Sequence, residues 1–90
     1  MSVAVHISPH HMSRADYESL IAELKASGVH EPAGRLSHVA YGEDEVRMFE
    51  TWESADHFNA HRDDLMAALQ SVGLDSADVE MQAVHSPRPD

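Results

Sequence analysis

The sequence predicts a single α+β domain whose elements follow the order strand, helix, strand, strand, helix, strand. Three observations support this prediction. Four segments alternate apolar and other residues as half-buried strands do, two segments carry apolar residues at helical spacing, and the four glycines stand at boundaries between elements. Ninety residues are enough for one core, and no linker divides the chain, so we expect one domain over residues 1–85.

The first strand and the first helix have clear local signals. Residues 3–7 alternate in the strand pattern, and residues 8–11 are expected to break it. Ser13 is a good N-cap residue, and Asp16 stands three residues later in the capping-box position. Gly28 stands where the C-terminus of a helix favours a left-handed residue, so we predict a helix between Ser13 and Gly28. Its apolar positions are Tyr17, Leu20, Ile21 and Leu24.

The middle of the chain predicts a hairpin of two strands. The polar loop at residues 42–44 contains a glycine, which is the usual mark of such a connection. Before the loop, one face of the strand is expected to hold Leu36, His38 and Ala40, and the other Ser37, Val39 and Tyr41. After the loop, a strand from about 45 to 52 is expected to place on one face Val46, Met48, Glu50 and Trp52.

The last third of the chain completes the pattern. Ser54 caps a second helix, which Gly73 ends. One stripe of this helix holds Phe58, His61, Leu65, Leu69 and Val72. A final strand is expected over about 78–85, and the proline-punctuated residues 86–90 are expected to be a disordered tail. The resulting βαββαβ order is the ferredoxin-like pattern, an antiparallel four-stranded sheet with two helices on one face.

The charge of the chain excludes several partners. Sixteen Asp and Glu residues against six Lys and Arg give a net charge of −10, with no basic stripe. Phosphate backbones and anionic membranes would repel such a surface, so we expect neither nucleic-acid nor membrane binding. The chain has no cysteine, no signal-peptide pattern and no apolar run near the ~20 residues that span a bilayer, so a soluble cytoplasmic protein is expected.

The eight histidines supply the candidates for chemistry. His57 and His61 lie one helical turn apart, so both imidazoles can reach one metal ion. The pair lacks the glutamate directly after the first histidine that makes the zinc-protease motif informative. A histidine-based metal protein is therefore an alternative function and not the leading one, and no metal ligand is assigned.

The strand residues offer a second set of candidates. His6, His38 and His85 each lie on a predicted strand and converge if their faces point into the same layer, but strand register does not follow from sequence. Glu50 shares the phase of Trp52. A buried carboxylate there would have a raised pKa and could act as a base, whereas we expect an edge position with access to solvent.

One local motif carries a resemblance to a known superfamily. The segment ETWES at residues 50–54 is followed by FNAH at 58–61, so that a histidine follows the tryptophan by nine residues. With the βαββαβ order, this motif resembles the dimeric α+β barrel superfamily, and within it the bacterial families similar to antibiotic-biosynthesis monooxygenases. The haem-degrading members carry a helix tryptophan and a ligating histidine that this sequence lacks. The resemblance therefore implies no cofactor.

The resemblance also implies a function and an assembly. Enzymes of this group oxidise flat aromatic compounds with O₂ and without metal or flavin, in homodimers whose sheets pack face to face. On this hypothesis His61 or His38 takes the proton, and the substrate-binding candidates are Trp52, Glu50 and His85. The alternatives are a packed core role for Trp52 and His61, and a non-catalytic dimer that binds a small molecule or serves a stress response.

Overall fold

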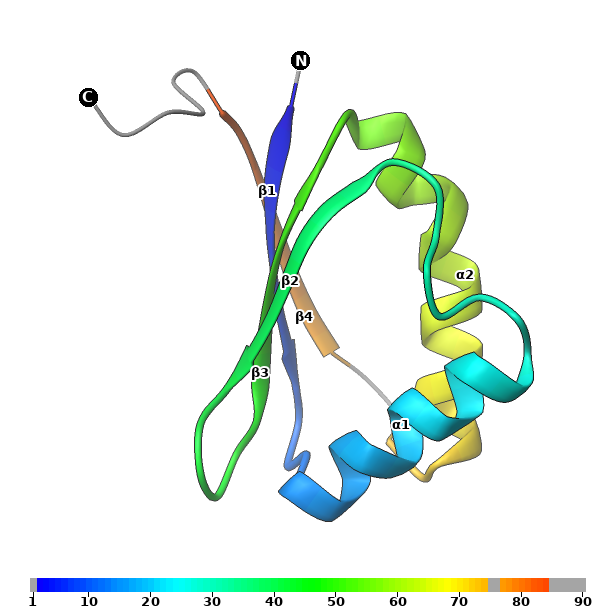
Figure 1. Cartoon of the computed structure of the whole chain (residues 1–90). Coiled ribbons are helices and arrows are strands. Elements are labelled where there is room, and N and C mark those ends of the chain that lie inside the picture. Colours follow the sequence, from blue (N-terminus) through cyan, green and yellow to red (C-terminus); the bar gives the residue numbers. More distant parts are fainter. Residues whose placement is uncertain (1, 75–76, 85–90) are drawn as a thin grey trace.

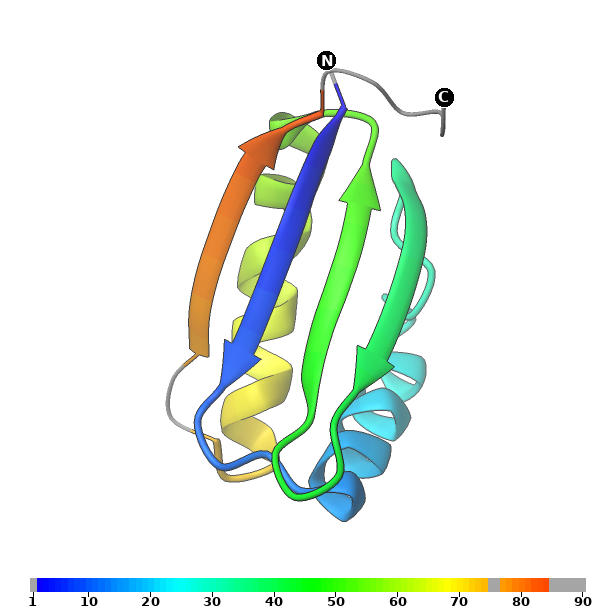
Figure 2. The same cartoon turned by 90° about the vertical axis from the view of Figure 1, so that its left-hand side faces the viewer.

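A computed structural model of the chain describes residues 2–74 and 77–84 and has the expected order of elements. The elements are β1 (Val3–Pro9), α1 (Arg14–Ala26), β2 (Arg35–Tyr41), β3 (Arg47–Trp52), α2 (Ala55–Ser71) and β4 (Ala77–Ala83). The strands form one antiparallel sheet in the order β2-β3-β1-β4 (Figures 1 and 2). The prediction of a ferredoxin-like α+β fold is confirmed.

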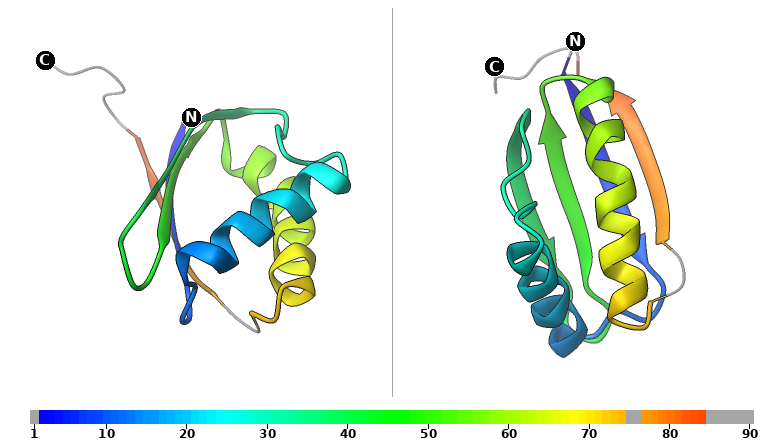
Figure 3. Two further views of the ribbon diagram at one scale, coloured as in Figure 1. Left: turned by 60° about the horizontal axis from the view of Figure 1, so that its bottom comes forward. Right: turned by 90° about the vertical axis from the view of Figure 1, so that its right-hand side faces the viewer.

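Both helices lie on one face of the sheet, and the other face is uncovered (Figure 1). In the right-hand panel of Figure 3, α2 crosses in front of β1, and α1 lies beside β2. The core lies between these two layers. Its largest fully buried side chains are Trp52, Phe58, Ile7, Met12, Leu20, Met48, Leu69 and Val5.

Local capping sets the ends of both helices as the sequence predicts. Ser13 and Asp16 form a capping box, in which each side chain accepts a hydrogen bond from the backbone N–H of the other at 3.1 Å. The Ser54 hydroxyl accepts from the backbone N–H of His57 at 3.2 Å. Gly28 and Gly73 follow the two helices with φ of 75° and 87°, a conformation that glycine adopts at little cost.

The structure corrects the expected alternation of β2. The pairing of β2 with β3 shifts register between Arg35 and Ser37, so that Arg35 stands opposite Trp52. Leu36 is 57% exposed, and the prediction that it shares a face with His38 is wrong. An extra residue in a strand moves the side chains before it to the opposite face. The irregularity therefore turns Arg35 toward the helices, where alternation had placed Leu36.

Smaller differences concern the ends of the strands. β1 continues through Ser8 to Pro9, both paired with β4, whereas we expected it to end at residue 7. β4 begins at Ala77. His85 and the predicted tail at 86–90 lie outside the described residues. Within the described ranges, no helix has the length and apolar character needed to cross a membrane.

Candidate functional site

A buried carboxylate stands at the centre of the inner face of the sheet. Glu50 is 3% exposed, because it lies on β3, an interior strand between β2 and β1. Its Oε2 accepts a hydrogen bond from Nδ1 of His38 at 2.6 Å, and its Oε1 accepts one from the indole N–H of Trp52 at 2.9 Å. The expectation of a solvent-accessible edge position for Glu50 is wrong, because the hairpin partner β2 occupies that edge.

The partners of Glu50 also determine its ionisation. Burial raises the pKa of the carboxyl, but hydrogen bonds from His38 and Trp52 and the positive charge of Arg35 outweigh burial and lower the pKa. We had expected burial to raise this pKa, and that direction is wrong. Glu50 is therefore a fixed negative charge near neutral pH and acts on its neighbours as an acceptor.

A hydrogen-bonded chain runs from Glu50 through His38 to Tyr17. Nε2 of His38 lies 2.8 Å from the Tyr17 hydroxyl on α1. Because an ionised carboxylate can only accept, Nδ1 of His38 carries a proton; in the neutral imidazole Nε2 therefore accepts and the Tyr17 hydroxyl donates. Burial raises the pKa of Tyr17, the charge of Arg35 opposes this, and the charge of Glu50 adds to it, so the phenol keeps its proton near neutral pH.

The Tyr17 and His38 rings are nearly parallel. Their planes differ by 8° and their centroids lie 6.1 Å apart. Because the two ring edges share a hydrogen bond of 2.8 Å, the rings lie edge to edge and not face to face. They line a cavity of about 270 Å³, which we call the His38 cavity. Its lining residues are Tyr17, Glu18, Ile21, His30, Arg35 and His38.

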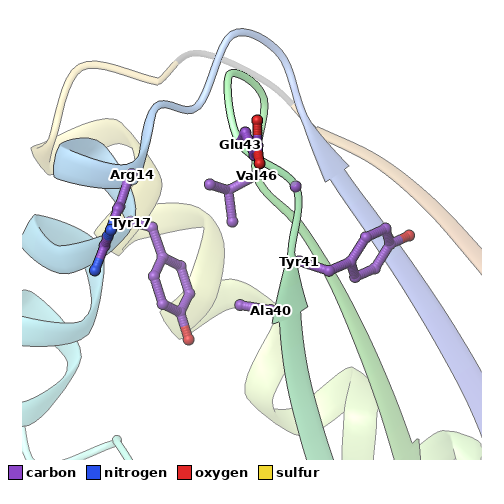
Figure 4. Close-up of a pocket in the computed structure, with 7 residues that line it drawn as sticks. Arg14, Tyr17, Ala40, Tyr41, Glu43 and Val46 are labelled. Carbon is purple, nitrogen blue, oxygen red and sulfur yellow. The ribbon is translucent and has the colours of Figure 1, made fainter.

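A second hollow adjoins Tyr17 on the side of the β2–β3 hairpin. Its volume is about 460 Å³, and Tyr17 and Ala40 are among the residues that line it. Figure 4 shows Tyr17 pointing from α1 toward Ala40, whereas the Tyr41 ring points to the other side of the sheet. Tyr17 therefore contributes to both hollows.

Arg35 places a positive charge at the wall of the His38 cavity. Its Nη2 donates to the backbone oxygen of His30 at 2.9 Å, and its Nη1 lies 3.5 Å from Oε2 of Glu50. The Arg35 side chain is 15% exposed. Sequence reasoning missed Arg35 because a register shift leaves no mark in the hydrophobic pattern. It also missed Tyr17, which the helical spacing had placed among the core residues.

Trp52 is inside the core. Its side chain is fully buried, and its ring packs against Phe58 and His61, each with a centroid separation of 5.5 Å. In this conformation the indole has no surface open to a ligand. Its N–H instead fixes the orientation of Glu50. Stacking of Trp52 on a substrate stays a prediction that requires this part of the core to open.

His61, the other candidate base, belongs to a different cavity. This space of about 340 Å³, the His61 cavity, is lined by Gly28, Val29, Glu31, Pro32, Ala33, His57, Ala60, His61 and Asp64. The segment joining α1 to β2 contributes to both cavities, because His30 lines the first and Glu31 the second. Burial lowers the pKa of His61, and the charge of Glu50 only partly opposes this.

Of the remaining histidine candidates, His57 lines the His61 cavity and His6 lies on the other face of the sheet. His6 pairs across the sheet with Phe49 and packs edge-on against its ring at 4.8 Å, on the face opposite to His38. His6 and His38 therefore do not converge, and His85 lies outside the described residues. Nδ1 of His57 is hydrogen-bonded to the Ser54 hydroxyl at 2.6 Å. Among residues 2–74 and 77–84, no three His, Cys, Asp or Glu side chains are grouped to hold a metal ion.

Comparisons with known proteins bear on the fold. The sequence matches no protein-family profile and no curated protein. Among solved structures, the chain is similar to Rv0793 from Mycobacterium tuberculosis, with 21% identity, coverage of 99% of this chain and all of that chain, and a TM-score of 0.68.

Two further similar structures are described as oxygenases. SnoaB, a cofactor-independent oxygenase from Streptomyces nogalater, has 17% identity over 99% of this chain and 97% of its own, with a TM-score of 0.66. The monooxygenase ActVA-Orf6 of Streptomyces coelicolor, solved with the ligand nanaomycin D, has 18% identity over 99% of this chain and 91% of its own, with a TM-score of 0.63. The chain thus has the ferredoxin-like fold of the antibiotic-biosynthesis monooxygenase-like proteins.

Proposed function

We propose that this protein is a cofactor-independent oxygenase that acts on a flat hydroxyaromatic compound in the His38 cavity. The observation that carries the proposal is the unbroken chain from the buried Glu50 carboxylate through His38 to the cavity-lining Tyr17 hydroxyl. A carboxylate that holds an imidazole by Nδ1 leaves Nε2 free to accept a proton. The nearly parallel rings of Tyr17 and His38, which both line the cavity, suit a planar ligand.

The hydrogen bonds define a route for the proton. A substrate bound against Tyr17 gives its acidic proton to the Tyr17 oxygen while the Tyr17 proton passes to Nε2 of His38. The ionised Glu50 stabilises the imidazolium that results. The raised pKa of Tyr17 makes a free tyrosinate unfavourable. Because the phenol gives up one proton as it receives the other, no tyrosinate has to form. General-base catalysis of this kind is worth about 10²–10⁴-fold in rate.

The oxygen step balances without a cofactor. The deprotonated substrate carbon gives an electron pair to O₂ in two one-electron transfers, and a C–O bond forms. The peroxide takes the proton back from His38 as a hydroperoxide. A second proton then leaves the same carbon, the O–O bond breaks, and water departs. A CH₂ group becomes a C=O group, one oxygen atom enters the product, and the other enters water.

We also propose that the protein is a homodimer joined through the uncovered face of the sheet. Two large apolar side chains on that face, Val39 and Tyr41, are 53% and 44% exposed. Phe49 on β3 pairs with Val39 and lies on the same face. A second copy related by a two-fold axis would cover this surface. Val39→Glu is expected to shift the mass measured by light scattering from dimer to monomer. A wild-type monomer at micromolar concentration would contradict the assembly.

The function is tested by oxygen consumption with 1,8-dihydroxyanthrone, a flat hydroxyaromatic with an acidic CH₂ group, in buffer containing EDTA. We expect turnover above the spontaneous rate, formation of the anthraquinone, and loss of about 10²-fold or more in His38→Gln. His61→Gln is the matched control and should keep the wild-type rate. Equal loss in both variants would contradict the assignment of His38. Binding without oxygen uptake in the wild type would favour a non-catalytic ligand carrier.

A further inference from the structure

The register shift in β2 brings a guanidinium into the His38 cavity. Arg35 stands opposite Trp52 on the helix-facing side, and Leu36 is on the surface. Burying a charged side chain is unfavourable unless its partners compensate. A strand that exposes leucine and turns arginine inward therefore has a local cost, and costs of this kind are expected where a residue serves a function.

The described partners use only part of the donor capacity of Arg35. A guanidinium has five N–H groups. One donates to the backbone oxygen of His30 and one approaches Oε2 of Glu50 at the long distance of 3.5 Å. Oε2 already accepts the shorter bond from His38 at 2.6 Å. The described residues thus leave donor groups of Arg35 available to a ligand in the cavity.

His30 lies beside Arg35 and has an unmatched polar atom. Its Nδ1 is buried and has no hydrogen-bond partner among the described residues, while the residue lines the same cavity. Buried polar atoms without a partner are uncommon, and each one needs an explanation. Arg35 donates to the backbone oxygen of His30 at 2.9 Å and both residues line the cavity, so we call this part of it the Arg35–His30 corner.

The charged group that faces a ligand at this corner is the guanidinium of Arg35. Arg35 lines the cavity, whereas Glu50 is 3% exposed, is not among the lining residues and already accepts hydrogen bonds from His38 and Trp52. The acidic residue that lines the cavity, Glu18, lies 3.8 Å from Arg14. The whole chain carries −10 and repels anions at long range, so a preference for them has to arise from this local arrangement.

We infer that the Arg35–His30 corner binds an oxyanion of the ligand, so that the substrate is a flat hydroxyaromatic acid whose carboxylate lies on Arg35 and whose reacting end lies against Tyr17. This inference rests on the proposed function, because it names the substrate class of the same cavity. Arg35 is a specificity residue here, and Tyr17 and His38 retain the proton chemistry. A guanidinium can hold a carboxylate through two parallel hydrogen bonds.

The test compares two probes that differ by one carboxylate, 1-hydroxy-2-naphthoate and 1-naphthol, by calorimetry at pH 7.5. The wild type is expected to bind the acid at least tenfold more tightly than the naphthol. Arg35→Gln should remove this preference and leave naphthol binding within about twofold. The matched control is Arg62→Gln, which removes the same charge. Arg62 is exposed on α2 and lines neither cavity, so this variant should keep the preference for the acid.

The outcomes separate this inference from the proposed function. Equal binding of the two probes by the wild type, or an unchanged preference in Arg35→Gln, would overturn the oxyanion corner and leave the oxygenase proposal in place. If neither probe binds and dihydroxyanthrone is not oxidised, the cavity itself is overturned as a site. Should circular dichroism show that Arg35→Gln does not fold, Arg35→Lys is used instead. We then expect the preference for the acid to be reduced but not lost, because lysine keeps the positive charge but cannot donate two parallel hydrogen bonds to a carboxylate.

Discussion

The His38 cavity and the His61 cavity each contain a candidate base, and the two imidazoles are held in different ways. His38 lies between two hydrogen-bonding partners, the carboxylate of Glu50 and the hydroxyl of Tyr17. His61 packs against the ring of Trp52, and no described residue forms a hydrogen bond with its ring. The motif in the sequence pointed to His61, whereas the geometry provides His38 with the partners that proton transfer needs.

The difference shows that burial alone does not prepare a histidine for catalysis. Burial of His61 lowers its pKa because the charged form is desolvated without a direct carboxylate partner. At His38 a carboxylate fixes the tautomer and can stabilise the charged form. Trp52 connects the two regions, since one edge of its ring donates to Glu50 and its face packs against His61. The same tryptophan thus supports the site without contacting a ligand.

The largest expected difference between the two regions is in stability. Glu50→Ala leaves His38, Trp52 and Arg35 without their buried acceptor, and we expect it to lower the free energy of unfolding by about 3–5 kcal/mol. His61→Leu loses no hydrogen bond to a described residue and should change it by about 1 kcal/mol or less. Urea denaturation followed by tryptophan fluorescence measures both. Similar losses of unfolding free energy in the two variants would mean that the hydrogen bonds of Glu50 stabilise the fold no more than the packing of His61 does.

A smaller effect is expected from the end of the hydrogen-bonded chain. Tyr17→Phe removes the hydroxyl that donates to His38 but keeps the ring, so turnover of dihydroxyanthrone should fall by about 10²-fold. The free energy of unfolding should change by about 1 kcal/mol, the value of one hydrogen bond. Tyr41→Phe, on the uncovered face, is the control and should retain full activity. An active Tyr17→Phe would mean that His38 receives the proton directly.

The smallest expected effects are two separate contributions to the pH dependence of stability. The pKa of His61 is lowered from 6.5, so the unfolded chain binds this proton more readily, and the stability from neutral His61 is lost as pH falls below about 6.5. The pKa of Glu50 is lowered from 4.5, so the stability from its ionised form is present above 4.5 and is lost as pH falls below it. Both groups therefore destabilise the fold on acidification, in different ranges.

Two variants separate these ranges when unfolding is measured from pH 8 to pH 3. His61→Leu should reduce the slope below pH 6.5 and above the range in which Glu50 titrates, and Glu50→Gln should reduce the slope below 4.5. Glu50→Gln keeps the shape of the side chain, which limits other changes. An unchanged upper slope in His61→Leu would show that His61 titrates normally in the folded protein.

Much of the fold was predictable because its signals are local. The capping box of Ser13 and Asp16, the cap at Ser54 and the glycines after both helices depend on neighbouring residues only, and the structure contains each of them. The inward phase of β3 was also correct, since Met48, Glu50 and Trp52 are all buried. The proposed dimer and the roles of the site residues remain predictions for the experiments above.

What the sequence determined by itself was the order of the elements and the inward faces of most of them, because side-chain periodicity follows from backbone geometry within each segment. Only the tertiary structure decided which candidates meet. It assigned His38 and His61 to separate cavities, moved Arg35 inward through a register shift, and lowered the pKa of a carboxylate that burial alone would have raised. Each of these depends on contacts between different elements, namely the register of β2 against β3 and the packing of the helices on the sheet, and the energies that set such contacts belong to no single segment.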